Sequence, residues 1–223
     1  MKKLIGICIS SALFASMSIS PAPVDINTPN MTKNRLNVNF FGYYTDDVDL
    51  NGLGIAYGRR TNENLIHDWV IGYSYATGEY GADHTIDSYT YNASYVIGKQ
   101  FSNELYVYGG ALFIYNDYED TVPYGSSGYD TYTYSTIYGL QAGIQKQFNT
   151  SFGRISPWFF ANVITGSSER ESNGKTTTSD IDTTTNTQFG LDIYLNSIES
   201  SLNLMYQIDD DAEAISLSYS YKF

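Results

Sequence analysis

The chain has 223 residues, including 22 Tyr, 11 Phe and 19 Gly, yet only 16% of its residues are charged, and its net charge is −12. This acidity disfavours nucleic acids and acidic sugars as partners, because anions are bound by clustered Lys or Arg. An anion-selective channel is disfavoured for the same reason, since it needs rings of basic side chains. The sequence also has no phosphate-binding glycine loop and no zinc-ligand spacing.

The first 18 residues have the layout of a secretory signal peptide. Lys2 and Lys3 precede an apolar run over residues 4–14, and small residues follow. The run is too short to span a bilayer. We predict cleavage after Ser18, with Ala15 as the alternative, and a short periplasmic segment over residues 19–34.

Cleavage would remove Cys8, which is the only cysteine of the chain. The mature protein would then have no disulfide and no thiol chemistry. The loss of Lys2 and Lys3 would lower the 12 basic residues to 10 against 24 acidic residues, a net charge of −14.

No later stretch approaches the roughly 18 consecutive apolar residues of a membrane-spanning helix. If the chain crosses a membrane, strands must cross it, and they must close into a barrel because open sheet edges are not tolerated in hydrocarbon. The sequence therefore has to supply enough strands that alternate between two environments.

Ten stretches alternate with a period of two. In the fourth, Tyr89, Tyr91 and Tyr95 alternate with Ser88 and Thr90. The ten stretches are residues 35–45, 52–59, 66–77, 87–99, 104–116, 131–147, 155–165, 185–195, 201–209 and 214–223. We predict an all-β fold: a transmembrane antiparallel up-and-down β-barrel of ten strands over residues 35–223, with eight strands as the alternative.

An even number of strands brings both termini to one side, which we assign to the periplasm. The connections predicted on that side are short. On the opposite side, three long polar loops are expected over residues 76–86, 116–130 and 166–184. Six tyrosines surround the second of these loops: Tyr115, Tyr118, Tyr124, Tyr129, Tyr132 and Tyr134.

The inward positions are mostly Gly, Ser, Thr, Asn and Gln, but five are bulky: Tyr106, Tyr108, Trp158, Phe160 and Met205. Side chains just fill the interior of an eight-stranded barrel, and ten strands enclose only modestly more space. We therefore expect a plugged lumen without free diffusion.

Four charged residues also fall on inward positions near the periplasmic ends of their strands: Arg35, Asp68, Asp192 and Lys222. If they pair, they are structural and close the mouth of the barrel. If they do not pair, they line a narrow channel that prefers cations.

The last strand carries Tyr219, Tyr221 and Phe223 on one face and serines on the other. This ending, "SYSYKF", resembles the assembly signal of outer-membrane β-barrel proteins, and the whole chain is similar to small porin-like and opacity-type surface barrels. The resemblance implies a place in the outer membrane of a Gram-negative bacterium. It also implies contact with outer-membrane lipid, lipopolysaccharide and the barrel assembly machinery.

Closure of the barrel places two acidic loops side by side. The loop after the first strand carries Asp46, Asp47 and Asp49, and the loop before the last carries Asp209, Asp210, Asp211 and Glu213. Hard divalent cations prefer such oxygen ligands, so one hypothesis is a Ca²⁺ or Mg²⁺ site that bridges to lipopolysaccharide phosphates. The alternative is a set of solvated carboxylates screened by salt. We expect no other cofactor.

For function, the sequence favours a non-enzymatic barrel that displays acidic, Tyr-rich loops. Its expected roles are interaction with an extracellular protein, glycan or phage, or envelope integrity. One alternative is a narrow porin for small neutral or cationic solutes. Another is an omptin-like protease, for which Asp83, His84 and the run 209–211 are the available acid and histidine residues.

Overall fold

The computed structural model describes residues 31–44, 48–62, 65–80, 84–101, 104–121, 130–198, 200–209 and 212–222. The predicted signal peptide and Phe223 lie outside these ranges. Every element in the described ranges is a β-strand. None of them contains a helix that is long and apolar enough to cross a membrane.

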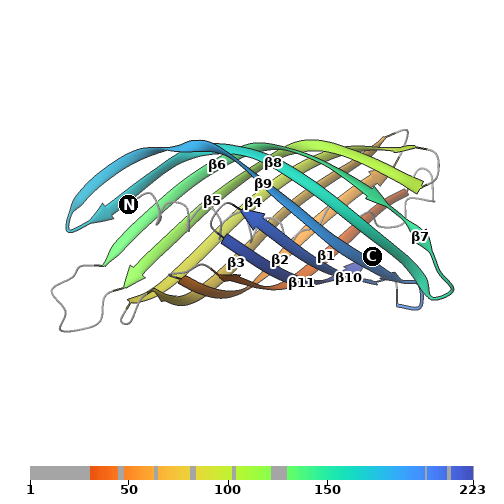
Figure 1. Cartoon of the computed structure of the whole chain (residues 1–223), viewed down its shortest axis with the longest axis horizontal. Helices are drawn as coiled ribbons and strands as arrows, with labels where there is room; N and C mark the ends of the chain where they lie inside the picture. Colours follow the sequence, from red (N-terminus) through yellow and green to blue (C-terminus); the bar gives the residue numbers. More distant parts are fainter. Residues whose placement is uncertain are drawn as a thin grey trace.

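The strands form one closed antiparallel barrel (Figure 1). They are β1 (Met31–Tyr44), β2 (Val48–Asn62), β3 (Ile66–Tyr80), β4 (His84–Phe101), β5 (Leu105–Thr121), β6 (Thr131–Lys146), β7 (Phe148–Asn149), β8 (Gly153–Ser172), β9 (Lys175–Leu195), β10 (Ser200–Asp209) and β11 (Ala212–Lys222). Sequential strands pair, β1 pairs with β11, and β6 pairs with β8. The two-residue β7 only extends the β6–β8 hairpin. The predicted up-and-down barrel of ten strands is therefore confirmed.

Side chains alternate between the lumen and the outside, as the period of two predicts. Phe40, Ile71 and Leu140 point outward and are 62%, 61% and 69% exposed, whereas the inward Asn39 and Ser74 are each 1% exposed. Exposed apolar side chains of this kind surround the barrel. Such a belt matches the apolar band of a membrane-spanning barrel, and it would be an aggregation hazard in water.

The barrel has two unlike ends. The start of β1 and the end of β11 lie at one end, where Arg35 pairs with Lys222, and we call this the short-turn end. The other is the long-hairpin end. There β8 and β9 have 20 and 21 residues, so each extends by about ten residues, or about 33 Å along the strand, beyond the stretch needed to cross hydrocarbon. Figure 1 shows the β8–β9 hairpin reaching far beyond the shorter β10–β11 hairpin.

The predicted long loop over residues 166–184 is wrong, because this stretch forms a β-ribbon. Asn173 and Gly174 make its turn with positive φ angles of 51° and 67°, as a two-residue hairpin turn requires. The flanking Thr residues are β-branched and favour extended backbone despite their polarity. The other two loops are also shorter than predicted. Strand β3 ends at Tyr80 and β4 begins at His84, while β5 ends at Thr121. The intervening residues 81–83 and 122–129 lie outside the described ranges.

Candidate functional sites

A cluster of ion pairs lies in the lumen near the short-turn end. Arg35 Nη1 on β1 lies 2.9 Å from Asp68 Oδ1 on β3, and Arg60 Nη2 on β2 contacts the other oxygen of the same carboxylate. These three side chains are at most 3% exposed. The structure thus pairs two of the four charged residues singled out in the sequence and adds Arg60.

Gly58 explains how Arg35 reaches a carboxylate two strands away. Gly58 lies opposite Arg35 on the intervening strand β2. A Cβ atom at this position would come within 2.8 Å of Arg35 Nε. The Arg35 side chain therefore crosses β2 over the glycine and reaches Asp68 on β3.

Of the other two predicted members of the cluster, the structure describes the side chain of Asp192 but not that of Lys222. Asp192 on β9 is 2% exposed and interacts electrostatically with Arg60. Lys222 pairs with Arg35 in the strand register, but its side chain lies outside the described part of the structure. Two arginines and two aspartates of the described cluster therefore balance in charge.

Aromatic side chains fill the lumen beside this cluster. Tyr106, Tyr108, Trp158 and Phe160 all point inward, as predicted, and are at most 4% exposed. The ring centroids of Tyr108 and Phe160 are 6.0 Å apart, and those of Trp158 and Phe160 are 5.9 Å apart. Met205, the fifth predicted bulky residue, is 1% exposed.

Amide and hydroxyl side chains occupy the lumen toward the long-hairpin end, and several of them bond to one another. Asn162 Nδ2 donates to Asn186 Oδ1 at 2.9 Å, and Gln188 Nε2 donates to Gln207 Oε1 at 2.9 Å. Ser88 donates to Asn116 Oδ1 at 3.0 Å. Buried polar groups need such partners, so these side chains act as packed wall contacts.

On the outer surface, the apolar belt ends at a row of tyrosines on neighbouring strands. Tyr73, Tyr91 and Tyr115 lie side by side on β3, β4 and β5, with centroid distances of 5.1 Å and 6.3 Å. Aromatic girdles mark the edge of the hydrocarbon in membrane barrels. Outward residues nearer the long-hairpin end than this row therefore lie outside the membrane-spanning segments.

Beyond this girdle, two rows of outward side chains cross strands β3 to β9, and we call them the tyrosine–carboxylate strip. The first row is Tyr75, Tyr89, Asp117, Tyr134, Glu169 and Thr178, and the second is Thr77, Asp87, Glu119, Tyr132, Glu171 and Thr176. Neighbours within each row are directly paired residues. None of these side chains is basic.

The carboxylates in the strip affect one another and the tyrosines. Partial burial and then the nearby Glu119 raise the pKa of Asp117 above its ordinary value. A hydrogen bond to Glu119 raises the pKa of Tyr132, while burial and then Asp117 raise the pKa of Tyr134. Tyr75 donates a 2.5 Å hydrogen bond to Asp87. The strip thus concentrates negative charge among neutral phenols.

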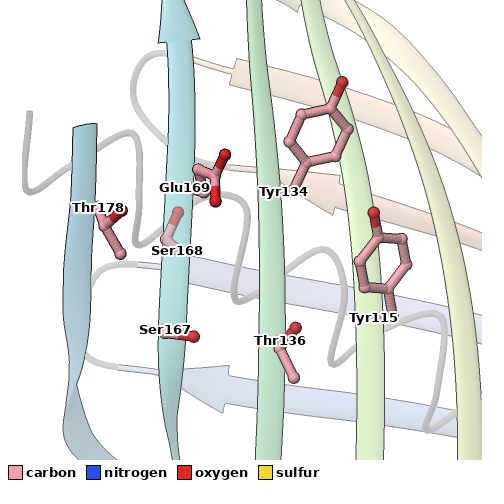
Figure 2. A pocket seen from close by; sticks show the side chains of 7 residues that line it. All are labelled: Tyr115, Tyr134, Thr136, Ser167, Ser168, Glu169 and Thr178. Carbon is pink, nitrogen blue, oxygen red and sulfur yellow. The ribbon is translucent and has the colours of Figure 1, made fainter. Parts of the chain in front are cut away.

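A hollow of about 300 Å³ lies at the centre of this face, partly within the strip (Figure 2). Tyr115 and Tyr134 line one side, and Glu169 and Thr178 line the other. The small side chains of Thr136 and Ser167 leave the space between them. Sequence reasoning missed this site because it assigned residues 166–184 to a loop.

At the C-terminus, Tyr219 and Tyr221 point outward and are 42% and 50% exposed, and Tyr219 donates a 2.9 Å hydrogen bond to Ser200. Phe223, the last residue of the predicted assembly signal, lies outside the described residues.

Most of the predicted acidic rim also lies outside them. Asp46, Asp47, Asp210 and Asp211 are not described, and of Asp49, Asp209 and Glu213 only the backbone is described. The register does pair Tyr44 with both Asp49 and Glu213, so β1 lies between the two acidic segments.

Two further checks concern enzymatic sites. Within the described ranges, no group of three or more His, Cys, Asp or Glu could hold a metal ion. Of the protease candidates, Asp83 and the side chains of His84 and residues 209–211 are not described.

Comparisons with known proteins identify the fold. No protein-family model matches the sequence, and no curated protein matches it significantly. The translocator domain of the autotransporter NalP from Neisseria meningitidis is similar in structure, with a TM-score of 0.68 and 10% identity over 99% of this chain and 95% of that chain. An outer-membrane channel from Pseudomonas putida F1 has a TM-score of 0.52 and 11% identity over 92% and 100% of the two chains. The chain therefore has the fold of outer-membrane β-barrel proteins.

Proposed function

We propose that the chain is a non-enzymatic protein of the outer membrane of a Gram-negative bacterium that acts through its surface outside the cell. Its long-hairpin end would be extracellular, and both termini would be periplasmic. Two features support this orientation: the start of β1 and the end of β11 share the short-turn end, and the strands extend beyond the belt at the opposite end. Bacterial barrels have short periplasmic turns and longer extracellular segments.

The burial of the lumen side chains is the observation that carries the proposal. A solute would have to displace Tyr108, Trp158 and Phe160 and break the contacts of Asp68 with two arginines. Such a barrel offers no ready path for diffusion, whereas the strip and its hollow are accessible on the outside. We therefore place the function at the extracellular surface, in interaction with a protein, glycan or phage, or in envelope integrity.

A planar-bilayer recording of the refolded barrel tests the closed lumen. We expect no steady conductance steps from the native chain. Replacing Tyr108 and Trp158 by Ala should introduce them, because both rings lie in the aromatic plug. Steady cation-selective steps from the native chain would instead establish the alternative, a narrow porin for small neutral or cationic solutes.

Excision of the β8–β9 ribbon tests the surface role. Joining Thr165 to Thr184 through an Asn-Gly turn should leave a barrel that still shows heat-modifiable gel migration. It should also remove cell-surface or phage-binding phenotypes of the native chain. Unchanged phenotypes, in cells where the native chain has them, would overturn the assignment of function to this end.

Assembly would involve lipopolysaccharide, outer-membrane lipid and the barrel assembly machinery, as the terminal "SYSYKF" implies. The supporting observation is that Tyr219 and Tyr221 face outward at the last strand. Deletion of Phe223 should lower the amount of assembled barrel in cells more than it lowers refolding in detergent. Equal losses in both would point to a structural role for this residue.

A further inference from the structure

The tyrosine–carboxylate strip has the dimensions of a binding surface for a short extended peptide. It runs from β3 to β9 over five strand spacings. Adjacent strands are about 4.8 Å apart, so the strip is about 24 Å long, which equals about seven residues of an extended chain.

Like charges face one another within the strip. Asp87 and Glu119 are directly opposite in the β4–β5 register. Like charges at directly opposite positions destabilise a sheet. Partial burial is the main cause of the raised pKa of Asp117, and the neighbouring charge of Glu119 adds to it. A cationic ligand would relieve this repulsion, whereas a neutral ligand would not.

The tyrosines narrow the choice of cation. Tyr134 separates Asp117 from Glu169 in the first row, and Tyr132 separates Glu119 from Glu171 in the second. The tyrosines thus divide the carboxylates into two groups, and among the described residues no group of three or more acidic side chains could hold a metal ion, whereas a divalent ion needs several oxygens converging on one point. A guanidinium group uses both kinds of side chain, because it stacks on aromatic rings and forms paired hydrogen bonds with carboxylates.

The hollow offers a place for one such side chain. Its volume of about 300 Å³ equals the share of about ten molecules of liquid water. Tyr134 and Glu169 are directly opposite in the β6–β8 register and border the hollow from two sides (Figure 2). A guanidinium entering it would meet a ring face and a carboxylate together.

We propose that the tyrosine–carboxylate strip binds an Arg-rich segment of a polypeptide outside the cell, with one Arg side chain in the hollow beside Tyr134 and Glu169. This inference rests on the proposed function, because it requires the strip to face the outside. It adds to that function the chemical class of the ligand.

Binding of a labelled nona-arginine peptide to the barrel in phosphatidylcholine nanodiscs tests the proposal. The double variant Glu169→Gln with Glu171→Gln should weaken binding about tenfold, since two charge pairs are lost. The matched control, Glu104→Gln with Glu213→Gln, removes the same charge at positions outside the strip and should change the affinity less than twofold. Tyr134→Leu should reduce the preference for nona-arginine over nona-lysine. Gel migration before and after heating verifies that each variant is folded.

Several results would overturn the proposal. If both double variants weaken binding equally, nona-arginine binds through the overall negative charge of the protein and not through the strip. Calcium binding that is lost in Glu169→Gln with Glu171→Gln, without nona-arginine binding, would assign the strip to a divalent cation. Binding of a neutral oligosaccharide that requires Tyr134, again without nona-arginine binding, would assign it to a glycan. The nanodisc assay does not depend on conductance. If the barrel conducts ions and still binds nona-arginine, the hypothesis of a closed lumen is overturned and the proposal of peptide binding is not.

Discussion

Asp68 on β3 and Asp117 on β5 belong to the same barrel, yet their side chains differ in exposure and in the charges around them. Asp68 faces the lumen, is 1% exposed and contacts two arginines. Asp117 faces outward beyond the girdle, among tyrosines and other carboxylates. The protein itself neutralises the charge inside the barrel, while the charge outside depends on solvent or a partner. Asp68 in the lumen therefore holds the barrel together, whereas Asp117 belongs to the strip that we propose as a binding surface.

Removal of the Asp68 carboxylate should have the largest effect. In Asp68→Ala, the buried guanidinium groups of Arg35 and Arg60 lose this counter-charge. Breaking a buried ion pair by removing one partner costs about 3–5 kcal/mol. Urea unfolding of the barrel in lipid vesicles, followed by tryptophan fluorescence, measures the loss.

Glu169→Ala is the matched control for Asp68→Ala, because it removes an exposed carboxylate. Exposed substitutions usually change stability by about 0.5 kcal/mol or less. Comparable losses in the two variants would contradict the division between structural and available carboxylates.

Gly98→Ala should have the next largest effect and sharpens the description of the lumen. A Cβ atom at Gly98 would lie 2.4 Å from the ring of Tyr108. Overpacking a tight interior costs about 1–3 kcal/mol. The same urea unfolding measures it, and the penalty should nearly vanish when Tyr108 is also replaced by Ala.

Gly109→Ala serves as the control for Gly98→Ala. At Gly109 the nearest atom to an added Cβ would be 3.9 Å away, so Ala fits without strain. We expect a neutral or slightly stabilising effect there, because Ala has less freedom than Gly in the unfolded chain. A loss at Gly109 as large as at Gly98 would argue against a ring packed on the glycine.

Gly174→Ala tests the β8–β9 ribbon, which carries Glu169 and Glu171 of the strip. Its φ of 67° is unfavourable for Ala, so the ribbon should lose about 1 kcal/mol of local stability. Hydrogen exchange of the ribbon amides should speed up, while the urea midpoint of the barrel stays unchanged. Gly174→Asn is the control, since Asn tolerates this conformation better. Uniform exchange changes throughout the barrel would contradict an independent ribbon.

Period-two patterning predicted most of this architecture. On β11 it separated Ile215, Leu217 and Tyr219 from Ser216 and Ser218, and the structure confirms both faces. The reason is physical, since each strand borders hydrocarbon on one side and a packed lumen on the other.

The arginine cluster could be predicted only in part. Arg60 was missed because the predicted second strand ended at residue 59, although the alternation of β2 continues through Arg60 to Asn62. The contact of two arginines with one carboxylate depends on the register of three strands and on Gly58. The spacing of residues within a single strand predicts neither this register nor the packing on Gly58.

The β8–β9 ribbon was missed for a different reason. Polar composition indicated a loop, while the Asn-Gly pair, with a run of Thr residues shortly after it, was the stronger signal for a hairpin. The strip that depends on this ribbon was therefore not predicted as a unit, although its tyrosines were noted.

Asp117→Asn should have the smallest effect, and its sign is opposite to that of Asp68→Ala. Partial burial and Glu119 raise the pKa of Asp117 in the folded barrel. The folded state therefore binds a proton at Asp117 more tightly than the unfolded state does. For this group, stability falls as pH rises from the ordinary value of about 3.9 to the raised folded pKa, and it stays reduced above that pH.

Removing the carboxylate should consequently shift the urea midpoint slightly upward at pH 7 and leave it nearly unchanged at pH 3. Solvent screening keeps the shift small, because Asp117 is only partly buried. Urea titrations of the native chain and of Asp117→Asn at both pH values measure the difference. A lower midpoint at pH 7 would mean that Asp117 makes a stabilising contact in the folded barrel. Its carboxylate would then have a structural role, like that of Asp68 in the lumen.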